Sequence, residues 1–163
     1  MKKIALLFSM LFVMAIVNEA KAQNYQSALG LRLAFPLAAS YKFFISEPAA
    51  IELYLGIRSY SIGYTFLNPG AMYQYHFPIN GVDGLNWYVG GGASLYLYNF
   101  KDNYCSDCDG LAFGLNGALG LDYKFANAPI NLSVDWLPTI VIAGNFSGFG
   151  GSYGALAARY TLN

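Results

Sequence analysis

Between Leu111 and Phe125 the sequence alternates between two kinds of residue at every position. The odd positions are apolar apart from one glycine, and the even positions are small, polar or charged. Successive side chains of a strand point to opposite faces, so this pattern predicts a strand with one apolar face, whereas a helix needs apolar spacings of three and four. Tilted by about 45°, a strand of this length rises roughly 35 Å, enough to cross a hydrocarbon layer of about 30 Å. Such a strand is typical of a transmembrane β-barrel.

The composition agrees with a wall that faces lipid. Hydrophobic residues make up 56% of the 163 positions and charged residues only 11%, with 18 glycines, 14 tyrosines and 12 phenylalanines. The formal net charge of zero leaves no basic surface for nucleic acid, so we expect no nucleic-acid partner.

The first 22 residues have the pattern of a cleaved signal peptide. Lys2 and Lys3 precede the apolar stretch 4–17, and Ala20-Lys21-Ala22 forms a cleavage site, so we expect a mature barrel domain of residues 23–163. The alternative, a membrane anchor helix, needs about 20 apolar residues.

The same alternation recurs in seven other segments. They are 27–35, 38–45, 50–58, 62–77, 86–98, 130–140 and 152–162. Together with 111–125 they predict an all-β fold, an eight-stranded antiparallel up-and-down transmembrane β-barrel. Such barrels place short turns in the periplasm and longer loops outside, so both termini should be periplasmic and the loop 99–110 extracellular.

Segment 62–77 is the least regular of the eight. Its apolar residues occupy even positions before Asn68-Pro69-Gly70 and odd positions after it. We interpret this change as a β-bulge at the tripeptide, because one extra residue reverses the parity. The alternative is a longer loop over 59–70 followed by a short strand.

Charged residues test the strand register independently, because a Lys or Arg on the lipid face at mid-depth costs about 2–4 kcal/mol. Eight of them fall on the inward face and form the predicted lumen charge network: Arg32, Lys42, Glu52, Arg58, Asp122, Lys124, Asp135 and Arg159. An eight-stranded barrel is just wide enough to be filled by side chains. We therefore expect the mixed charges to pair across a filled lumen, with Arg32 and Arg159 near the closure seam.

Large aromatic residues at outward positions are expected to settle at the membrane–water boundary. They are Tyr73, Tyr75, Trp87, Trp136 and Tyr160. Stacking platforms for sugars or bases are the alternative, and the lipid-facing parity argues against them.

The remaining candidate sites carry little specific chemistry. Cys105 and Cys108 have a C-x-x-C spacing in an exported loop, where we favour a disulfide; free thiols and a metal or redox role stay open. The aspartates 102, 107 and 109 do not complete a calcium-loop pattern. His76, the only histidine, has no serine within three residues. We therefore predict no cofactor, no metal and no catalytic residues.

Several short stretches carry a family resemblance in their order along the mature chain. They are Gly30-Leu31-Arg32-Leu33, Ser40-Tyr41-Lys42, Ala50-Ile51-Glu52, Tyr73-Gln74-Tyr75-His76, Leu85-Asn86-Trp87-Tyr88-Val89-Gly90, Leu132-Ser133-Val134-Asp135-Trp136-Leu137-Pro138 and Ala158-Arg159-Tyr160. In this order the chain resembles small outer-membrane β-barrel proteins of the Bacteroidetes type and, more distantly, the OmpX and OmpA membrane domains. The resemblance implies the fold, an outer-membrane location and insertion by the barrel-assembly machinery. That machinery usually reads a terminal aromatic residue, which this chain lacks.

The expected function is non-enzymatic: a monomeric barrel in outer-membrane lipid with a structural or adhesive role through its extracellular loops. One alternative is a binding or transport barrel for a small apolar ligand, opening sideways to the membrane near Asn68-Pro69-Gly70. A lipid-modifying enzyme is disfavoured because no catalytic constellation is present. A soluble lipocalin-like barrel is disfavoured because 11% charge is too little for a soluble exterior.

Overall fold

The computed structural model describes residues 25–61, 63–100, 110–143, 147–150 and 154–162. The predicted signal peptide with its cleavage site, Cys105 and Cys108, and the aspartates 102, 107 and 109 lie outside the described residues. Within them no helix is long and apolar enough to span a membrane.

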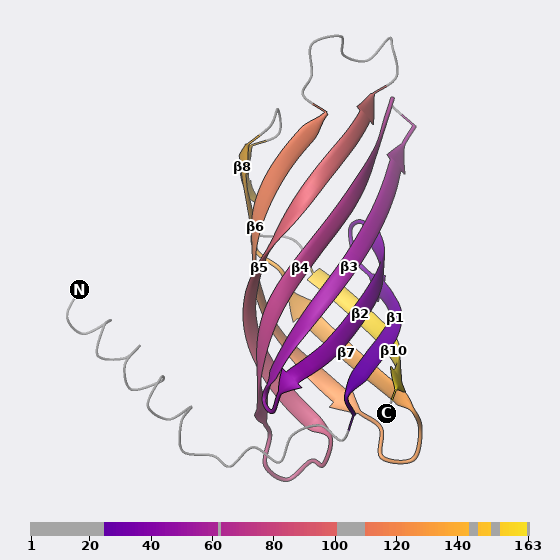
Figure 1. Cartoon of the computed structure of the whole chain (residues 1–163), viewed down its shortest axis with the longest axis vertical. Coiled ribbons are helices and arrows are strands. Elements are labelled where there is room, and N and C mark those ends of the chain that lie inside the picture. Colours follow the sequence, from indigo (N-terminus) through magenta and orange to yellow (C-terminus); the bar gives the residue numbers. More distant parts are fainter. Residues whose placement is uncertain (1–24, 62, 101–109, 144–146, 151–153, 163) are drawn as a thin grey trace, which may run out of the picture.

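Ten strands form one sheet in which all neighbours are antiparallel. They are β1 (Ser27–Leu33), β2 (Leu37–Ser46), β3 (Ala49–Tyr60), β4 (Tyr64–Pro78), β5 (Leu85–Phe100), β6 (Leu111–Lys124), β7 (Ile130–Trp136), β8 (Thr139–Ala143), β9 (Gly148–Gly150) and β10 (Gly154–Leu162). The sheet follows the order β5-β4-β3-β2-β1-β10-β7-β6-β8-β9, and β5 also pairs with β6, which closes it. Figure 1 shows the resulting tilted cylinder.

The ten strands make eight barrel walls, which confirms the predicted fold class. β7 and β8 pair with β6 in one register, because Leu119 lies opposite Trp136 and Asn116 opposite Thr139. They are one strand interrupted at Leu137-Pro138, where proline has no N–H to donate. β9 and β10 pair with β8 and β7 and form the next wall. The predicted strand over 130–140 is therefore interrupted and extends to Ala143, and residues 148–150, which lie between two predicted strands, form a strand of their own.

The strand pairing fixes the tilt of the barrel. A line perpendicular to the strands runs from Gly30 through Ser40, Tyr54, Gly70 and Ser94 to Gly114 on β6. In the other direction it runs from Gly30 through Arg159 and Asn131 to Lys124, also on β6. The two ends differ by ten positions, from 114 to 124. For eight strands about 4.7 Å apart this stagger gives a tilt of roughly 40°, as closed barrels have.

The predicted β-bulge in β4 is wrong. β4 pairs with β3 in one unbroken register from Tyr75 opposite Ala49 to Tyr64 opposite Tyr60. Even positions therefore face the lumen along the whole strand, and Phe66, expected on the lipid face, is only 6% exposed. The apolar parity changes because the lumen itself changes from polar to aromatic, and no residue is inserted.

A side-chain hydrogen bond replaces the backbone hydrogen bond that is missing at Pro69. The register with β5 places Pro69 opposite Leu95, and proline cannot donate to the Leu95 carbonyl. The Asn68 side chain donates to that carbonyl from 2.8 Å instead. The wall is therefore continuous at the tripeptide.

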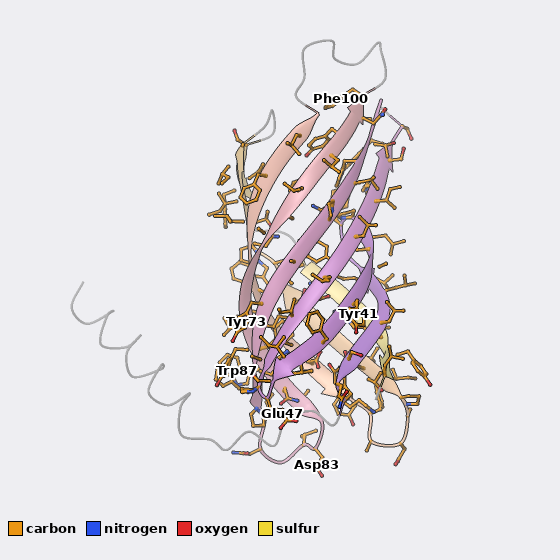
Figure 2. All side chains as sticks on the ribbon, in the orientation of Figure 1. Tyr41, Glu47, Tyr73, Asp83, Trp87 and Phe100 are labelled. Carbon is orange, nitrogen blue, oxygen red and sulfur yellow. The ribbon has the colours of Figure 1, made fainter. Side chains whose placement is uncertain are left out.

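The exterior of the barrel is apolar and its interior carries the charges. Outward leucines, isoleucines and valines are about half exposed on all sides, among them Leu55 at 54%. Figure 2 places Tyr41, Tyr73 and Trp87, which are all exposed, in the lower half of the barrel, and both β1 and β10 reach the lower end, where Ser27 lies opposite Leu162. "Lower" and "upper" refer throughout to Figure 1.

Leu55 lies midway along β3, and Leu55→Arg should lower the free energy of unfolding by about 2–4 kcal/mol if this face meets lipid. Ile45→Arg, the same kind of change close to a lower turn, should cost only about 0–1 kcal/mol. Urea unfolding in phospholipid vesicles, followed by tryptophan fluorescence, measures both. Equal, negligible effects would mean that the apolar exterior does not face hydrocarbon.

Candidate functional site

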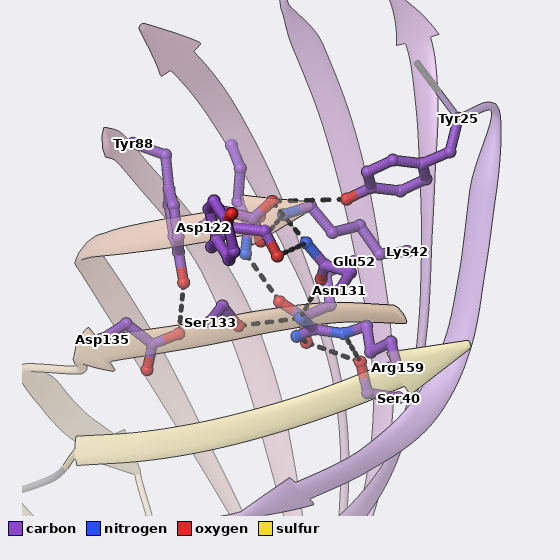
Figure 3. Close-up of polar contacts among 12 residues, drawn as sticks. Tyr25, Ser40, Lys42, Glu52, Tyr88, Asp122, Asn131, Ser133, Asp135 and Arg159 are labelled. Carbon is purple, nitrogen blue, oxygen red and sulfur yellow. Dashed lines mark hydrogen bonds and ion pairs between the residues drawn. The ribbon is translucent and has the colours of Figure 1, made fainter. Parts of the chain in front are cut away.

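Glu52 is at the centre of a polar network that fills the lower lumen (Figure 3). Its Oε1 accepts hydrogen bonds from Arg32 Nη1 and Arg159 Nη2, each at 2.6 Å, and from Ser40 Oγ at 2.7 Å. Its Oε2 accepts one from Gln74 Nε2 at 2.6 Å. The five side chains come from β1, β2, β3, β4 and β10, so this single carboxylate joins five walls of the barrel.

Asp122 on β6 is the centre of a second set of hydrogen bonds, which lies below the set around Glu52. Its Oδ1 accepts from Lys42 Nζ at 2.9 Å, and its Oδ2 accepts from Asn131 Nδ2 at 2.8 Å. The Tyr25 hydroxyl, just before β1, reaches the same Oδ2 from 3.4 Å. Burial raises the pKa of the Tyr25 phenol above its ordinary value, so this group is a neutral donor. Arg159 Nη1, 3.3 Å from Asn131 Oδ1, links this set to Glu52.

Asp135 on β7 completes the network. Arg32 Nη2 donates to both of its carboxylate oxygens, at 2.9 and 2.7 Å, and the Tyr88 hydroxyl donates to Oδ2. Gly120 makes this meeting possible, because a Cβ there would come within 2.6 Å of the Asp135 Cβ and 2.9 Å of the Tyr88 ring.

Three cations and three anions thus neutralise one another inside the barrel. Each of the six is at most 6% exposed: Arg32, Lys42, Arg159, Glu52, Asp122 and Asp135. A buried charge is tolerated only when it is paired and hydrogen-bonded, and every member of this set is. These six side chains are thus almost entirely removed from solvent.

Two of the eight charges predicted for the network do not join it. Arg58 lies higher, with its guanidinium carbon 3.6 Å from the centroid of the Phe35 ring and 5.1 Å from that of Tyr60. Lys124 lies at the lower rim, where it donates to the carbonyls of Phe125 and Ala128 at 2.6 and 2.8 Å. An odd or even position in the sequence predicts which face of a strand a residue occupies, but not how far along the barrel axis it lies. Arg58 and Lys124 differ from the other six residues in that position along the axis.

The uncharged members of the network were missed in the sequence. They are Tyr25, Ser40, Gln74, Tyr88, Asn131 and Ser133. All except Tyr25, which precedes β1, have the inward parity of their strands, so the pattern that found the charges could have found these partners as well.

His76 lies in the lower lumen between two rings. Its ring is 5.1 Å from that of Phe44 and 5.0 Å from that of Tyr88, and it is 2% exposed. Neither ring nitrogen has a hydrogen-bond partner among the described residues. No nucleophile is therefore positioned on this histidine, and the described residues contain no group of three or more metal-ligating side chains.

The predicted interface aromatics all lie on the exterior. Tyr73, Tyr75, Trp87, Trp136 and Tyr160 are between 36% and 58% exposed. The Trp87 ring stacks on Phe77 with centroids 4.3 Å apart, and Tyr75 packs against Phe77 at 4.9 Å. Figure 2 shows two of these residues, Tyr73 and Trp87, in the lower half of the barrel.

The upper lumen is aromatic and contains a cavity of about 240 Å³. Stacked and tilted rings line it, with centroids 4.7 Å apart for Tyr60 and Tyr64 and 5.5 Å for Phe66 and Tyr98. Met72, Tyr88 and Ala118 form a buried layer beneath it, packed against Tyr54 and Leu137. The layer is in contact with both regions, because Met72 lines the cavity and the Tyr88 hydroxyl donates to Asp135 in the network.

No family model and no curated protein matches this chain. Among solved structures it is similar to the N-terminal β-barrel domain of OprF from Pseudomonas aeruginosa, with 19% identity, a TM-score of 0.61, and coverage of 86% of this chain and 98% of that one. It is also similar to Neisserial surface protein A (NspA), with 13% identity, a TM-score of 0.52, and coverage of 83% and 93%. At these identities the likeness shows the fold. The chain is a closed eight-stranded antiparallel β-barrel.

Glu52→Ala should lower the free energy of unfolding of the barrel by about 3–5 kcal/mol, because Arg32 and Arg159 would remain buried without their shared acceptor. Glu47→Ala, at an exposed turn, removes the same carboxylate and should change the free energy of unfolding little. Urea unfolding in detergent micelles compares the two variants. Similar small losses for both would show that the network does not stabilise the barrel.

Proposed function

We propose that this chain is a non-enzymatic outer-membrane β-barrel, closed across its lower half, with a structural or adhesive role through its upper loops. The observation that carries this proposal is the inverted distribution of polarity. The exterior is apolar on every side, and six paired charges are buried inside.

A soluble barrel would have the opposite arrangement. Monomeric soluble proteins seldom expose contiguous apolar patches larger than a few hundred Å², and a lipocalin-like barrel would bury its apolar residues inside. In lipid every backbone polar group must be paired internally, and a closed barrel does this because it has no free edge. The predicted signal peptide and the sequence resemblance support export to the outer membrane.

The orientation follows from the two ends. The connections at the lower end that join β2 to β3 and β6 to β7 are short, whereas at the upper end β5 ends at Phe100 and β6 begins only at Leu111. Barrels in the outer membrane have short periplasmic turns and longer external loops. Both termini would then be periplasmic. We further propose that the barrel is inserted as a monomer by the barrel-assembly machinery and contacts outer-membrane lipid.

An enzymatic role has little support in the described residues. His76 has no hydrogen-bond partner, and the buried carboxylates are each engaged by arginine, lysine, amide or hydroxyl groups. Nucleophilic catalysis needs a nucleophile and base in contact.

A ligand-binding role is the second candidate, but not by the route that the sequence suggested. At Asn68-Pro69-Gly70 the strand is paired with β3 throughout, and the Asn68 side chain bonds to Leu95 on β5 where the backbone pairing skips Asn68 and Pro69. The observation that favours binding is the cavity of about 240 Å³ in the upper lumen.

An epitope inserted between Asp102 and Asn103 should bind antibody on intact cells of a Gram-negative host, because this loop is proposed to be external. The same epitope between Val82 and Asp83, in the lower turn labelled in Figure 2, should bind antibody only after the outer membrane is permeabilised. Flow cytometry of both strains provides the measurement. Surface labelling of the Val82 insertion alone would reverse the orientation, and labelling of neither, with both proteins in the soluble fraction, would exclude the outer membrane.

A further inference from the structure

We propose that the upper lumen is a binding site for a small organic anion built on a single aromatic ring. The inference deepens the second candidate function and rests on the barrel being folded in lipid.

The walls of the cavity are suited to a flat ring. Tyr60, Phe66, Tyr96 and Tyr98 line it from three neighbouring strands, with the Phe66 ring 5.9 Å from Tyr96 and 5.5 Å from Tyr98. Such separations are those of packed aromatic pairs, which prefer offset or edge contacts with a further ring. A flat ring entering the cavity would meet ring faces and edges on several sides.

The size of the cavity limits the guest to one ring with a substituent. A cavity of about 150 Å³ holds one benzene molecule in another protein, whereas this one measures about 240 Å³. The excess leaves room for a carboxylate or a group of similar size.

The floor of the cavity is polar, and its hydrogen bonds are already made. Asn116 donates to the Tyr54 hydroxyl at 2.9 Å and accepts from Thr139 at 3.1 Å. Arg32, also at the floor, is held by Glu52 and Asp135. These groups fix the shape of the floor and leave it no unpaired charge.

Arg58 lies just outside the lining of the cavity and supplies a charge beside it. Its guanidinium lies over Phe35 and beside Tyr60, two rings that line the cavity. It forms no ion pair among the described residues, and its buried Nε has no hydrogen-bond partner. Among the described residues that line the cavity there is no Asp or Glu. An anionic group would therefore be preferred over a neutral or cationic one.

The described wall is lowest beside this arginine. β3 extends to Tyr60, whereas β2 begins at Leu37, opposite Ile57, and β1 ends at Leu33. In Figure 1, strands β3 to β6 rise above β1 and β10. The contact between Arg58 and Phe35 joins the tall wall to the low one, which places the cation where a ligand would enter.

The test uses the mature chain folded in lipid nanodiscs and three probes, 4-fluorobenzoate, 4-fluorobenzyl alcohol and 4-fluorobenzylamine, observed by fluorine NMR. The wild-type chain should bind 4-fluorobenzoate most tightly and at least tenfold more tightly than the amine. Empty nanodiscs measure partition into lipid.

Three single changes locate the site. Ala38→Trp places an indole in the cavity and should weaken binding of all three probes by at least tenfold, whereas Ala39→Trp, on the outer face of the same strand, should leave it unchanged. Arg58→Gln should weaken 4-fluorobenzoate severalfold and leave the alcohol unaffected, which keeps the proposal testable if Ala38→Trp does not fold.

Binding no stronger than to empty nanodiscs, or equal in the two tryptophan variants, would overturn the proposal. Either result with a correctly oriented, surface-exposed barrel would leave the proposed outer-membrane function intact. A chain that binds the probes but is absent from the outer membrane would contradict only the proposed outer-membrane function.

Discussion

The sharing of one carboxylate by two arginines is the interaction on which the rest of the barrel depends. Arg32 and Arg159 come from the first and last strands, which must be neighbours for the barrel to close, and their like charges repel unless an anion lies between them. Glu52 from β3 supplies it, with 2.6 Å contacts to both. Closure of the sheet therefore requires the lumen charges to be neutralised, because it brings these two arginines together.

This requirement divides the lumen into two parts with different chemistry. All six paired charges lie in the lower lumen, where each reaches a partner from another wall, and Arg32 is the one of them that also lines the cavity above. Higher in the lumen no ion pairs are present among the described residues, and rings take their place. In the upper half, rigid rings pack with gaps between them, and a cavity remains. In the lower half, short polar side chains pack closely and fill the lumen.

The sequence predicted the barrel well because a strand repeats every two residues and the penalty for a charge in lipid is large. Strand number, closure and the inward placement of Arg32, Glu52 and Asp135 follow from that rule alone. The alternation rule failed at Phe66. An aromatic side chain is stable both against lipid and inside an aromatic lumen, so the apolar positions there do not indicate which face is outside. The rule also failed to separate Arg58 and Lys124 from the network, since height along the axis depends on the shear of the whole sheet. The cavity depends on how rings from different strands pack, which no local pattern records.

The conductance of the purified barrel tests most directly whether the buried ion network closes the lumen. The mature chain would be reconstituted into a planar lipid bilayer in concentrated KCl at neutral pH, and the current recorded under an applied voltage. We expect insertion without open-channel current, because the six paired charges and their polar partners leave no water-filled path through the lower half. A steady, ohmic current from each inserted barrel would contradict it.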